Sequence, residues 1–215
     1  QAETKWAQAP AGIHAEMGEL AIQAVQRTMP DVEVCHLTDM TTPRLKGADR
    51  VIRRPIPSHQ LCFGRLDHYA ALEGDWLYLD TDVVAMRDVR DVFQDDLFDV
   101  AVCDRHKRPE GRVLQPHLQW KMPYNAGVIF SRSRTFWQRA RQYCPTLKAS
   151  RHAWLGDQES MNAICKTGDF RVLVLPGAIY NYAPDAPDED LSEKALVHYK
   201  GKRKAYVLPG YQIVP

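Results

Sequence analysis

Two aspartates follow a short apolar run, and their spacing is the feature of the sequence most able to do chemistry. Residues 76–79 lead directly into Asp80-Thr81-Asp82. Side chains alternate along a strand, so residues i and i+2 point the same way and the two carboxylates would meet at the rim of a sheet. Carboxylate oxygens suit Mg²⁺ or Mn²⁺, and such a metal can bind the phosphates of a nucleotide. The alternative is a solvated turn, because aspartate is common where strands end.

A histidine near the C-terminus has surroundings that suit a phosphate. The apolar run 195–197 ends at His198, and Gly201 and the basic residues 202–204 follow. Glycine lets the backbone approach a phosphate closely, and nearby cations stabilise its charge. The alternatives are a structural histidine at a strand end and a solvated basic tail. From these residues alone, both interpretations stay open.

Two further short motifs could line a ligand site. Residues 124–127 read Tyr-Asn-Ala-Gly before an apolar run, and small residues beside a sheet allow a ligand to approach closely. Asp157 follows Gly156 at the start of a predicted helix, where an aspartate can cap the first turn. A bulge or turn and an ordinary helix cap are the more common explanations of these two motifs, so neither motif indicates a site by itself.

Short apolar runs alternate with helical periodicity along the chain. Helices are predicted at 13–29, 58–72, 134–143 and 157–165, and strands at 32–37, 51–52, 76–79, 100–103, 126–130, 172–175 and 195–197. Apolar strands between helices predict an α/β fold with a largely parallel sheet covered on both faces. Ligands bind such sheets beyond the carboxyl ends of the strands, where Asp80, Asp104 and His198 all lie.

The composition excludes several classes of protein. With 215 residues, of which 45% are hydrophobic and 26% charged, the chain has enough apolar surface to fold, which excludes a disordered protein. A net charge of +1 argues against bulk nucleic-acid binding, and no apolar run is long enough to span a bilayer. The five cysteines are scattered without a Cys-x-x-Cys pair, so we expect reduced thiols and a cytoplasmic location, with peripheral membrane contact left open. Such a chain must bind anions through a local site, and a bound metal ion could supply the positive charge.

Taken in order, these motifs resemble those of the glycogenin-like, or LgtC-like, retaining glycosyltransferases of the family 8 type. The matching segments span about residues 14–206 and are Arg65-Leu66, residues 77–84, residues 124–128, Asp157-Gln158 with Met161-Asn162, Leu175-Pro176 with residues 180–182, and residues 198–204. The resemblance implies a GT-A fold with a mixed, mostly parallel sheet flanked by helices. It also implies a metal-dependent enzyme that moves a sugar from a nucleotide-sugar to an acceptor with retention.

The resemblance assigns roles at a metal and a diphosphate. Asp80 and Asp82 would bind Mn²⁺ (or Mg²⁺), with His198 as the third protein ligand. Gly201 and Lys204 would contact the diphosphate of the donor, which in this family is usually a UDP-sugar. The metal and Lys204 would then stabilise the charge that grows on the departing diphosphate.

A second set of roles concerns the donor sugar. Arg65 would approach the sugar or the pyrophosphate, and Asp104 would approach the sugar. The floor of the sugar site would come from three consecutive residues, Asn125, Ala126 and Gly127. Asp157 and Gln158 would lie near the anomeric carbon, where either could supply partial negative charge to an oxocarbenium-like sugar. A front-side displacement, in which the leaving phosphate takes the acceptor proton, and a covalent intermediate both stay open.

The chain departs from the family pattern near both ends. Family members begin with an apolar strand, whereas residues 1–10 are polar, so we expect the first strand to be missing. Ala205-Tyr206 replaces the Pro-Trp that usually follows the last lysine. We expect a single GT-A-like domain over residues 1–215, with an irregular segment at 1–12 and loops at 105–123 and 183–194.

Two other functions compete with glycosyl transfer. An apolar strand followed by Asp-x-Asp also begins the haloacid-dehalogenase-like phosphatases, although there the motif lies near the N-terminus. A degenerate GT-A domain that binds a nucleotide without catalysis is the second alternative. For a transferase, the expected partners are a nucleotide-sugar and either a carbohydrate or a lipid- or protein-linked glycan as acceptor, with no nucleic acid.

Overall fold

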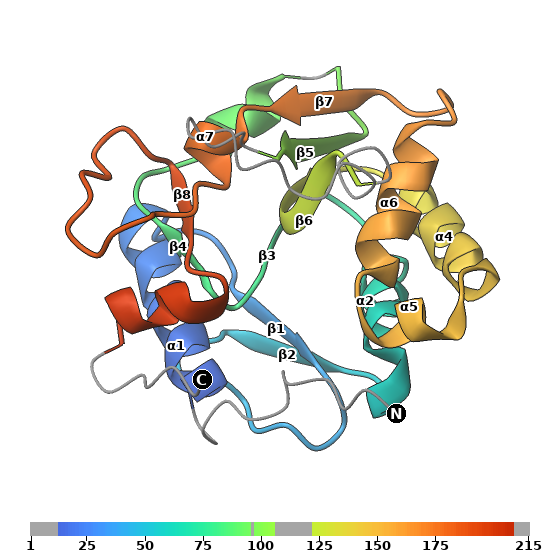
Figure 1. Cartoon of the computed structure of the whole chain (residues 1–215), viewed down its shortest axis with the longest axis horizontal. Helices are drawn as coiled ribbons and strands as arrows, with labels where there is room; N and C mark the ends of the chain where they lie inside the picture. The colour runs from blue at the N-terminus through green and yellow to red at the C-terminus, as the bar shows by residue number, and fades with distance from the viewer. Residues whose placement is uncertain (1–12, 96, 106–121, 209–215) are drawn as a thin grey trace.

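The computed structural model describes residues 13–95, 97–105 and 122–208 (Figure 1). The α-helices are α1 (Ile13–Thr28), α2 (Leu61–Tyr69), α4 (Arg134–Tyr143), α5 (Ala149–Ala153), α6 (Gly156–Cys165) and α7 (Gly177–Tyr180). The strands are β1 (Cys35–Thr38), β2 (Arg50–Arg53), β3 (Trp76–Leu79), β4 (Val83–Ala85), β5 (Val100–Asp104), β6 (Tyr124–Ser131), β7 (Val172–Leu175) and β8 (Leu196–His198). Short 3-10 turns are η1 (Ser58–Gln60), η2 (Arg90–Gln94), η3 (Cys144–Thr146) and η4 (Gly201–Tyr206).

The largest sheet has four strands in the order β3-β6-β5-β7. β6 is antiparallel to both β3 and β5, and β7 is parallel to β5. Therefore β3, β5 and β7 run in one direction and β6 runs in the other, which confirms the predicted α/β class and mixed sheet. Two smaller sheets pair β1 with β2 in parallel and β4 with β8 in antiparallel orientation. The carboxyl ends of β3, β5 and β7 meet at one edge, where ligands of such sheets bind.

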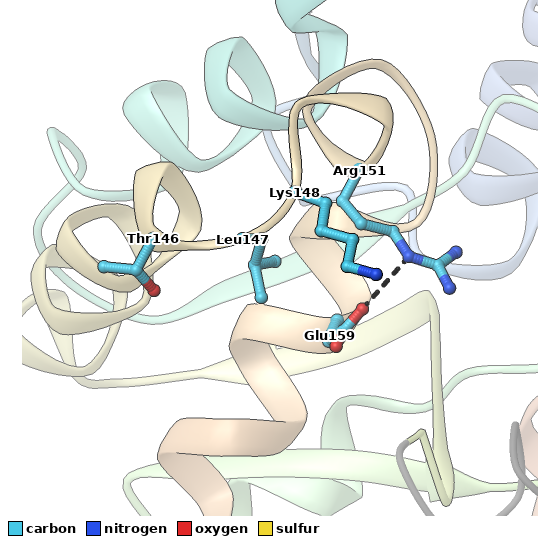
Figure 2. A pocket seen from close by; sticks show the side chains of 5 residues that line it. All are labelled: Thr146, Leu147, Lys148, Arg151 and Glu159. Carbon is cyan, nitrogen blue, oxygen red and sulfur yellow. Dashed lines mark ion pairs between the residues drawn. The ribbon is translucent and has the colours of Figure 1, made fainter.

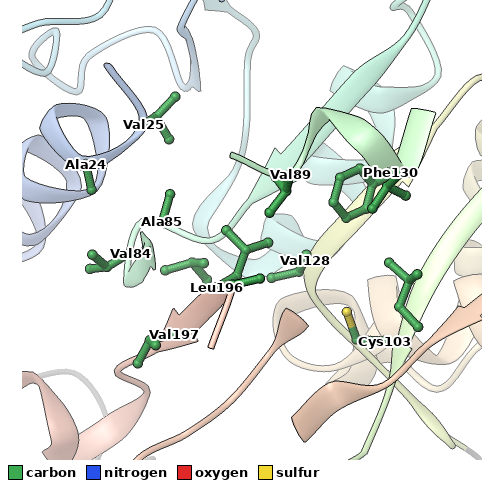
Figure 3. Packing of buried hydrophobic residues seen from close by; sticks show 14 of the residues in the cluster. Ala24, Val25, Val84, Ala85, Val89, Cys103, Val128, Phe130, Leu196 and Val197 are labelled. Carbon is green, nitrogen blue, oxygen red and sulfur yellow. The ribbon is translucent and has the colours of Figure 1, made fainter. Parts of the chain in front are cut away.

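Consecutive residues of β5 face opposite hydrophobic cores. Val100 and Val102 pack in the cluster under α2, α4 and α6, whereas Ala101 and Cys103 pack with residues of α1, β4 and β8 (Figure 3). All four side chains are fully buried. Figure 1 shows the same division, with α2, α4, α5 and α6 grouped on one side of the strands and α1 with β4 on the other. Burial on both faces explains why the strand is continuously apolar instead of alternating.

Several predicted elements have different ends in the structure, and some were missed. The predicted helix 58–72 divides into the turn η1 and the helix α2, which ends at Tyr69. β4, α5 and α7 were not predicted, because elements of three to five residues carry little periodic pattern. Residues 183–194 contain neither helix nor strand. The predicted irregular segment 1–12, and with it any first strand, and most of the predicted loop 105–123 lie outside the described residues.

The five cysteines are free thiols, and three of them, Cys62, Cys103 and Cys144, are buried. Burial, together with the charge of Asp157, raises the pKa of the Cys62 thiol to about 12, so this group stays neutral at physiological pH. Among the described helices, none combines the length and the apolar composition that crossing a lipid bilayer would require.

Phe130 tests how closely the core around β6 is packed. Its side chain is fully buried between β3 and β5, and its ring centroid lies 5.4 Å from that of Phe93. Because the truncation would leave a cavity, Phe130→Ala should lower the free energy of unfolding by about 3–5 kcal/mol, measured by urea denaturation followed by circular dichroism. Leu97→Ala, at a side chain that is 72% exposed, is the control and should change it by about 0.5 kcal/mol or less. Equal losses for the two variants would contradict the packing described.

Candidate active site

The turn between β3 and β4 carries the two aspartates at the carboxyl edge of the sheet. The Asp80 N–H donates to the carbonyl of Gly127 at 2.9 Å, and the Val83 N–H donates to the carbonyl of Asp80 at 3.0 Å. The Tyr199 N–H, which follows β8, donates to the carbonyl of Asp82 at 2.8 Å. Backbone hydrogen bonds to β6 and to the end of β8 therefore hold the turn in place.

His198 meets this turn because β8 pairs with β4, with His198 opposite Val83. The His198 Nε2 lies 3.0 Å from Asp82 Oδ1 and 3.6 Å from Asp80 Oδ2. One possible ligand atom from each of the three residues lies within 4.8 Å of the other two. The structure thus brings together the three residues that the sequence predicted as metal ligands.

This donor set fits a divalent cation. Ligand atoms that bind one ion at about 2.1 Å lie about 3–4 Å apart, close to the separations found here. Two carboxylate oxygens and an imidazole nitrogen suit Mn²⁺ or Mg²⁺. The other oxygen of each carboxylate is held by a cation, because Arg65 binds Asp80 Oδ1 and the Lys204 Nζ lies 2.5 Å from Asp82 Oδ2. Each carboxylate therefore keeps one oxygen on the side of His198.

A chain of side-chain hydrogen bonds orients the imidazole of His198. His198 Nδ1 lies 2.8 Å from Asn181 Oδ1, and Asn181 Nδ2 donates to Asn125 Oδ1 at 2.7 Å. Asn125 Nδ2 in turn donates to Gln158 Oε1 at 3.2 Å. An amide oxygen only accepts, so the Nδ1 carries a proton, and the Nε2 is the nitrogen that faces the aspartates and could bind a metal. Partners of this kind set the tautomer of metal-binding histidines.

Asn181 is a site residue to which sequence reasoning assigned no role. It is 5% exposed, and both of its hydrogen-bonding groups are used in this chain of contacts. In the sequence, Asn181 belongs to the matched segment 180–182, but that match does not indicate a contact with His198. The contact arises because Asn181 directly follows α7, beside β8.

Gly127 leaves the space that the imidazole of His198 needs. A Cβ added to Gly127 would lie 2.3 Å from the Cε1 of His198 and 2.6 Å from its Nδ1, closer than real atoms approach. The Gly127 N–H donates to Asn125 Oδ1 at 2.9 Å. The predicted floor of the sugar site, Asn125 to Gly127, therefore also supports the histidine.

Arg65 joins the turn to the start of α6. Its Nη1 lies 2.9 Å from Asp157 Oδ2, its Nη2 binds Asp80, and its Nε donates to the hydroxyl of Tyr69 at 2.9 Å. Burial alone would lower the pKa of Arg65, but the charges of Asp80 and Asp157 and the hydrogen bond to Tyr69 raise it well above its ordinary value. The guanidinium therefore stays charged and links two carboxylates that would otherwise repel each other.

Asp157 and Gln158, the two predicted catalytic residues, have different environments. Asp157 is 9% exposed, and its Oδ1 accepts the Gln158 N–H at 2.8 Å. The Gln158 Oε1 accepts from Asn125 Nδ2 and from the Ala126 N–H at 3.1 Å, while its Nε2 contacts Met122 Sδ at 3.3 Å. The Oε1 of Gln158 thus holds β6 against α6 through two hydrogen bonds.

Further cations surround the aspartates. Burial would raise the pKa of Asp82, but the hydrogen bond and charge of His198 and the charge of Lys204 hold it well below its usual range, so this carboxylate stays ionised. Lys200 and Arg105, to which the sequence analysis gave no role, lie within electrostatic reach. Burial, and secondarily Arg105, lowers the pKa of Lys200, whereas the aspartates of the turn oppose this.

Asp104 and Gly201 occupy other parts of this edge. The Asp104 Oδ1 accepts the Gly177 N–H at 2.6 Å, which ties the end of β5 to α7. Within the described residues, no hydrogen bond or ion pair joins Asp104 to Asp80, Asp82 or His198. Gly201 has a φ of +62°, a conformation that favours glycine, and it begins the turn η4, which returns Lys204 to Asp82.

Two surface hollows lie away from these residues. Thr146, Leu147, Lys148, Arg151 and Glu159 line one of about 260 Å³, where Arg151 Nε lies 3.3 Å from Glu159 Oε2 (Figure 2). A second, of about 550 Å³, lies between α2 and α4 and is lined by polar residues that include Arg54, Asp67, Arg134 and Arg141. Neither hollow contains a predicted site residue.

The structure is similar to solved glycosyltransferases at low sequence identity. The galactosyltransferase LgtC, crystallised with donor and acceptor sugar analogues, gives a TM-score of 0.60 at 16% identity over 88% of this chain and 84% of LgtC. GlyE of Streptococcus pneumoniae TIGR4 gives 0.62 at 20% identity over 95% of this chain, and WbbM, a bifunctional enzyme, gives 0.57 at 15% over 89%. The chain has a GT-A glycosyltransferase fold. It spans 55% of the GlyE chain and 44% of the WbbM chain.

The GT-A fold does not favour the phosphatase alternative, because the matched structures named here are glycosyltransferases. At the level of sequence, no protein-family model and no curated protein matches the chain. The similarity to these proteins is therefore a similarity of fold, and the activity is inferred from the residues of the site.

Asn181 gives a test of how the GT-A site orients its histidine. Asn181→Ala removes the acceptor of the Nδ1 proton but none of the three metal ligands, so the affinity for Mn²⁺ should fall by about 10- to 100-fold. The free Mn²⁺ signal in electron paramagnetic resonance measures this affinity. Asn181→Asp, which keeps an accepting oxygen, should retain more of it, and equal affinities for wild type and Asn181→Ala would contradict the orienting role.

Proposed function

We propose that this chain is a metal-dependent glycosyltransferase that moves a sugar from a UDP-sugar to an acceptor with retention of configuration. The observation that carries the proposal is the convergence of Asp80 Oδ2, Asp82 Oδ1 and His198 Nε2 at the edge where a GT-A fold would bind its donor. Arg65 and Lys204 support it, because they hold the remaining carboxylate oxygens and are cations beside the place of a diphosphate.

Asp80, Asp82 and His198 would hold Mn²⁺ or Mg²⁺, and the bound metal supplies charge that stabilises a leaving diphosphate. The chain's own contribution at this point is Lys204, a cation only 7% exposed that would face the same phosphates. The backbone of Gly201, free of a side chain, would allow the diphosphate to approach η4. Lys204 therefore both orients Asp82 and stabilises the charge of the departing group.

Asp157 is the residue that we assign to the sugar itself. Its carboxylate is held by Arg65 at 2.9 Å and is positioned at the start of α6, where it would stabilise positive charge at the anomeric carbon. Gln158 would position it, because its N–H donates to Asp157 Oδ1 while its Oε1 accepts from Asn125 and Ala126 of β6. Arg65, Asn125, Ala126 and Gly127 would surround the donor sugar, and Asp104 would approach it from β5.

We propose a front-side displacement for the chemical step. The bond between the anomeric carbon and the diphosphate oxygen breaks, the acceptor oxygen forms the new bond on the same face, and the acceptor proton passes to the leaving diphosphate. The acceptor is a carbohydrate or a lipid- or protein-linked glycan. The proposal includes a single domain and a cytoplasmic location, which the free thiols support.

Release of UDP tests the proposal. Wild-type protein with Mn²⁺ should slowly release UDP from at least one UDP-hexose, and EDTA should abolish the release. Asp80→Asn removes a metal-binding charge with little change of shape, so it should reduce the rate by about 100-fold or more. Asp31→Asn, at a carboxylate that is 85% exposed, is the matched control and should leave the rate unchanged.

Other outcomes of this assay would assign a different function. Cleavage of p-nitrophenyl phosphate without UDP release would indicate a phosphatase. UDP binding without either reaction would indicate the degenerate, non-catalytic domain. A rate in Asp80→Asn equal to that of wild type would contradict the metal site.

A further inference from the structure

Two large apolar side chains are exposed on the segments that lead into the Arg65–Asp157 ion pair. Trp154 is 62% exposed and Leu61 is 53% exposed. Exposed apolar groups that cluster beside a functional site indicate a binding surface, whereas scattered ones need no explanation.

The positions of Leu61 and Trp154 in the chain place both residues near the rim of the proposed site. Leu61 begins α2 four residues before Arg65, so the two lie one helical turn apart on the same face. Trp154 precedes Asp157 by three residues, a span of at most about 10 Å of chain. Arg65 Nη1 contacts Asp157 Oδ2 at 2.9 Å, and α5, which ends just before Trp154, packs against α2 and η1 (Figure 1). Leu61 thus lies four residues from one member of the ion pair, and Trp154 lies three residues from the other.

The turn that carries Trp154 is held in a strained conformation. Leu155 has a φ of +67°, and no other described residue besides glycine has a positive φ. Gly156 follows in a position where a Cβ would lie 2.2 Å from the Arg151 carbonyl oxygen. A left-handed non-glycine residue is unfavourable and persists where the surrounding structure requires it, often at ligand sites. Trp154 and Asp157 therefore lie on either side of this tight turn.

We propose that Trp154, together with Leu61, binds a neutral sugar ring of the acceptor. This inference rests on the proposed glycosyl transfer and names the substrate class at the same site. A pyranose has an apolar C–H face, which stacks on an indole, and a polar edge. Arg65 pairs with both Asp157 and Asp80, and Trp154 and Leu61 offer exposed apolar surface, so we expect apolar contact to dominate the binding of an uncharged ring. The ring would then lie beside Asp157, at the sugar that is transferred.

The first experiment measures how Trp154 changes acceptor use. The probes are p-nitrophenyl glycosides of glucose, galactose and N-acetylglucosamine, with p-nitrophenyl glucuronide as the charged comparison. Trp154→Ala should raise the KM for the best neutral glycoside by about 10-fold or more, and a larger share of the UDP released should come from hydrolysis. Trp154→Phe should restore much of the affinity, and Leu61→Ala should have a smaller effect of the same sign. Leu97→Ala is the matched control, because Leu97 is also an exposed leucine but precedes the amino end of β5, opposite the edge that carries the site.

Saturation-transfer NMR with the same glycosides gives a readout that does not need turnover. A neutral glycoside should bind wild-type protein, and its signal should weaken in Trp154→Ala while UDP binding with Mn²⁺ is still detected. Binding of no neutral glycoside, stronger binding of the glucuronide, or loss of transfer and hydrolysis in equal proportion would overturn the proposal. Absence of UDP release in wild type, with glycoside binding intact, would instead contradict the proposed function.

Discussion

Three carboxylates, Asp80, Asp82 and Asp157, lie close together at one edge of the sheet, and their mutual repulsion is the constraint around which this site is built. Two like charges about 4 Å apart in a partly buried setting repel by about 4 kcal/mol, a large fraction of the stability of a domain. Arg65 lies between Asp80 and Asp157, and Lys204 pairs with Asp82. These ion pairs join α2, the turn after β3, α6 and η4, so neutralising the site also ties the fold together.

The arrangement leaves one oxygen of each turn aspartate on the side of His198, and this is where a metal would complete the neutralisation. The position of the histidine depends in turn on groups that carry no charge. Gly127 provides the space for the ring, and the amides of Asn181, Asn125 and Gln158 set its tautomer. The same chain of amides reaches the residue next to Asp157. The proposed metal site and the proposed sugar site are therefore one connected structure, so a change in one would alter the geometry of the other.

Much of the fold was predictable because its strands are buried on both faces. Continuous apolar runs such as 100–103 indicate a covered sheet, and the polar residues that end them mark the edge where ligands bind. The grouping of Asp80, Asp82 and His198 was predicted from the family resemblance, and the structure brings them together. β4 escaped prediction because three residues carry no period, although its pairing with β8 is what delivers His198 to the turn.

The contacts that could not be predicted are those between side chains far apart in sequence. Arg65 lies 92 residues from Asp157, and no local pattern indicates that they form an ion pair. The role of Asn181 depends on the path of the chain after α7. The left-handed conformation of Leu155 could not be predicted either, because leucine rarely adopts it. The contacts of Gln158 with Asn125 and Ala126 of β6 were likewise not predicted, and its role in the reaction stays a prediction.

The central claim is that the Asp80–Asp82–His198 site joins a metal to the diphosphate of the donor. Isothermal titration calorimetry of UDP into the wild-type protein, with Mn²⁺ and then with EDTA in its place, tests this claim most directly. The account predicts binding of one UDP per chain in the presence of Mn²⁺ and weakening by about 100-fold or more without it. UDP affinity that is the same with and without the metal would contradict it.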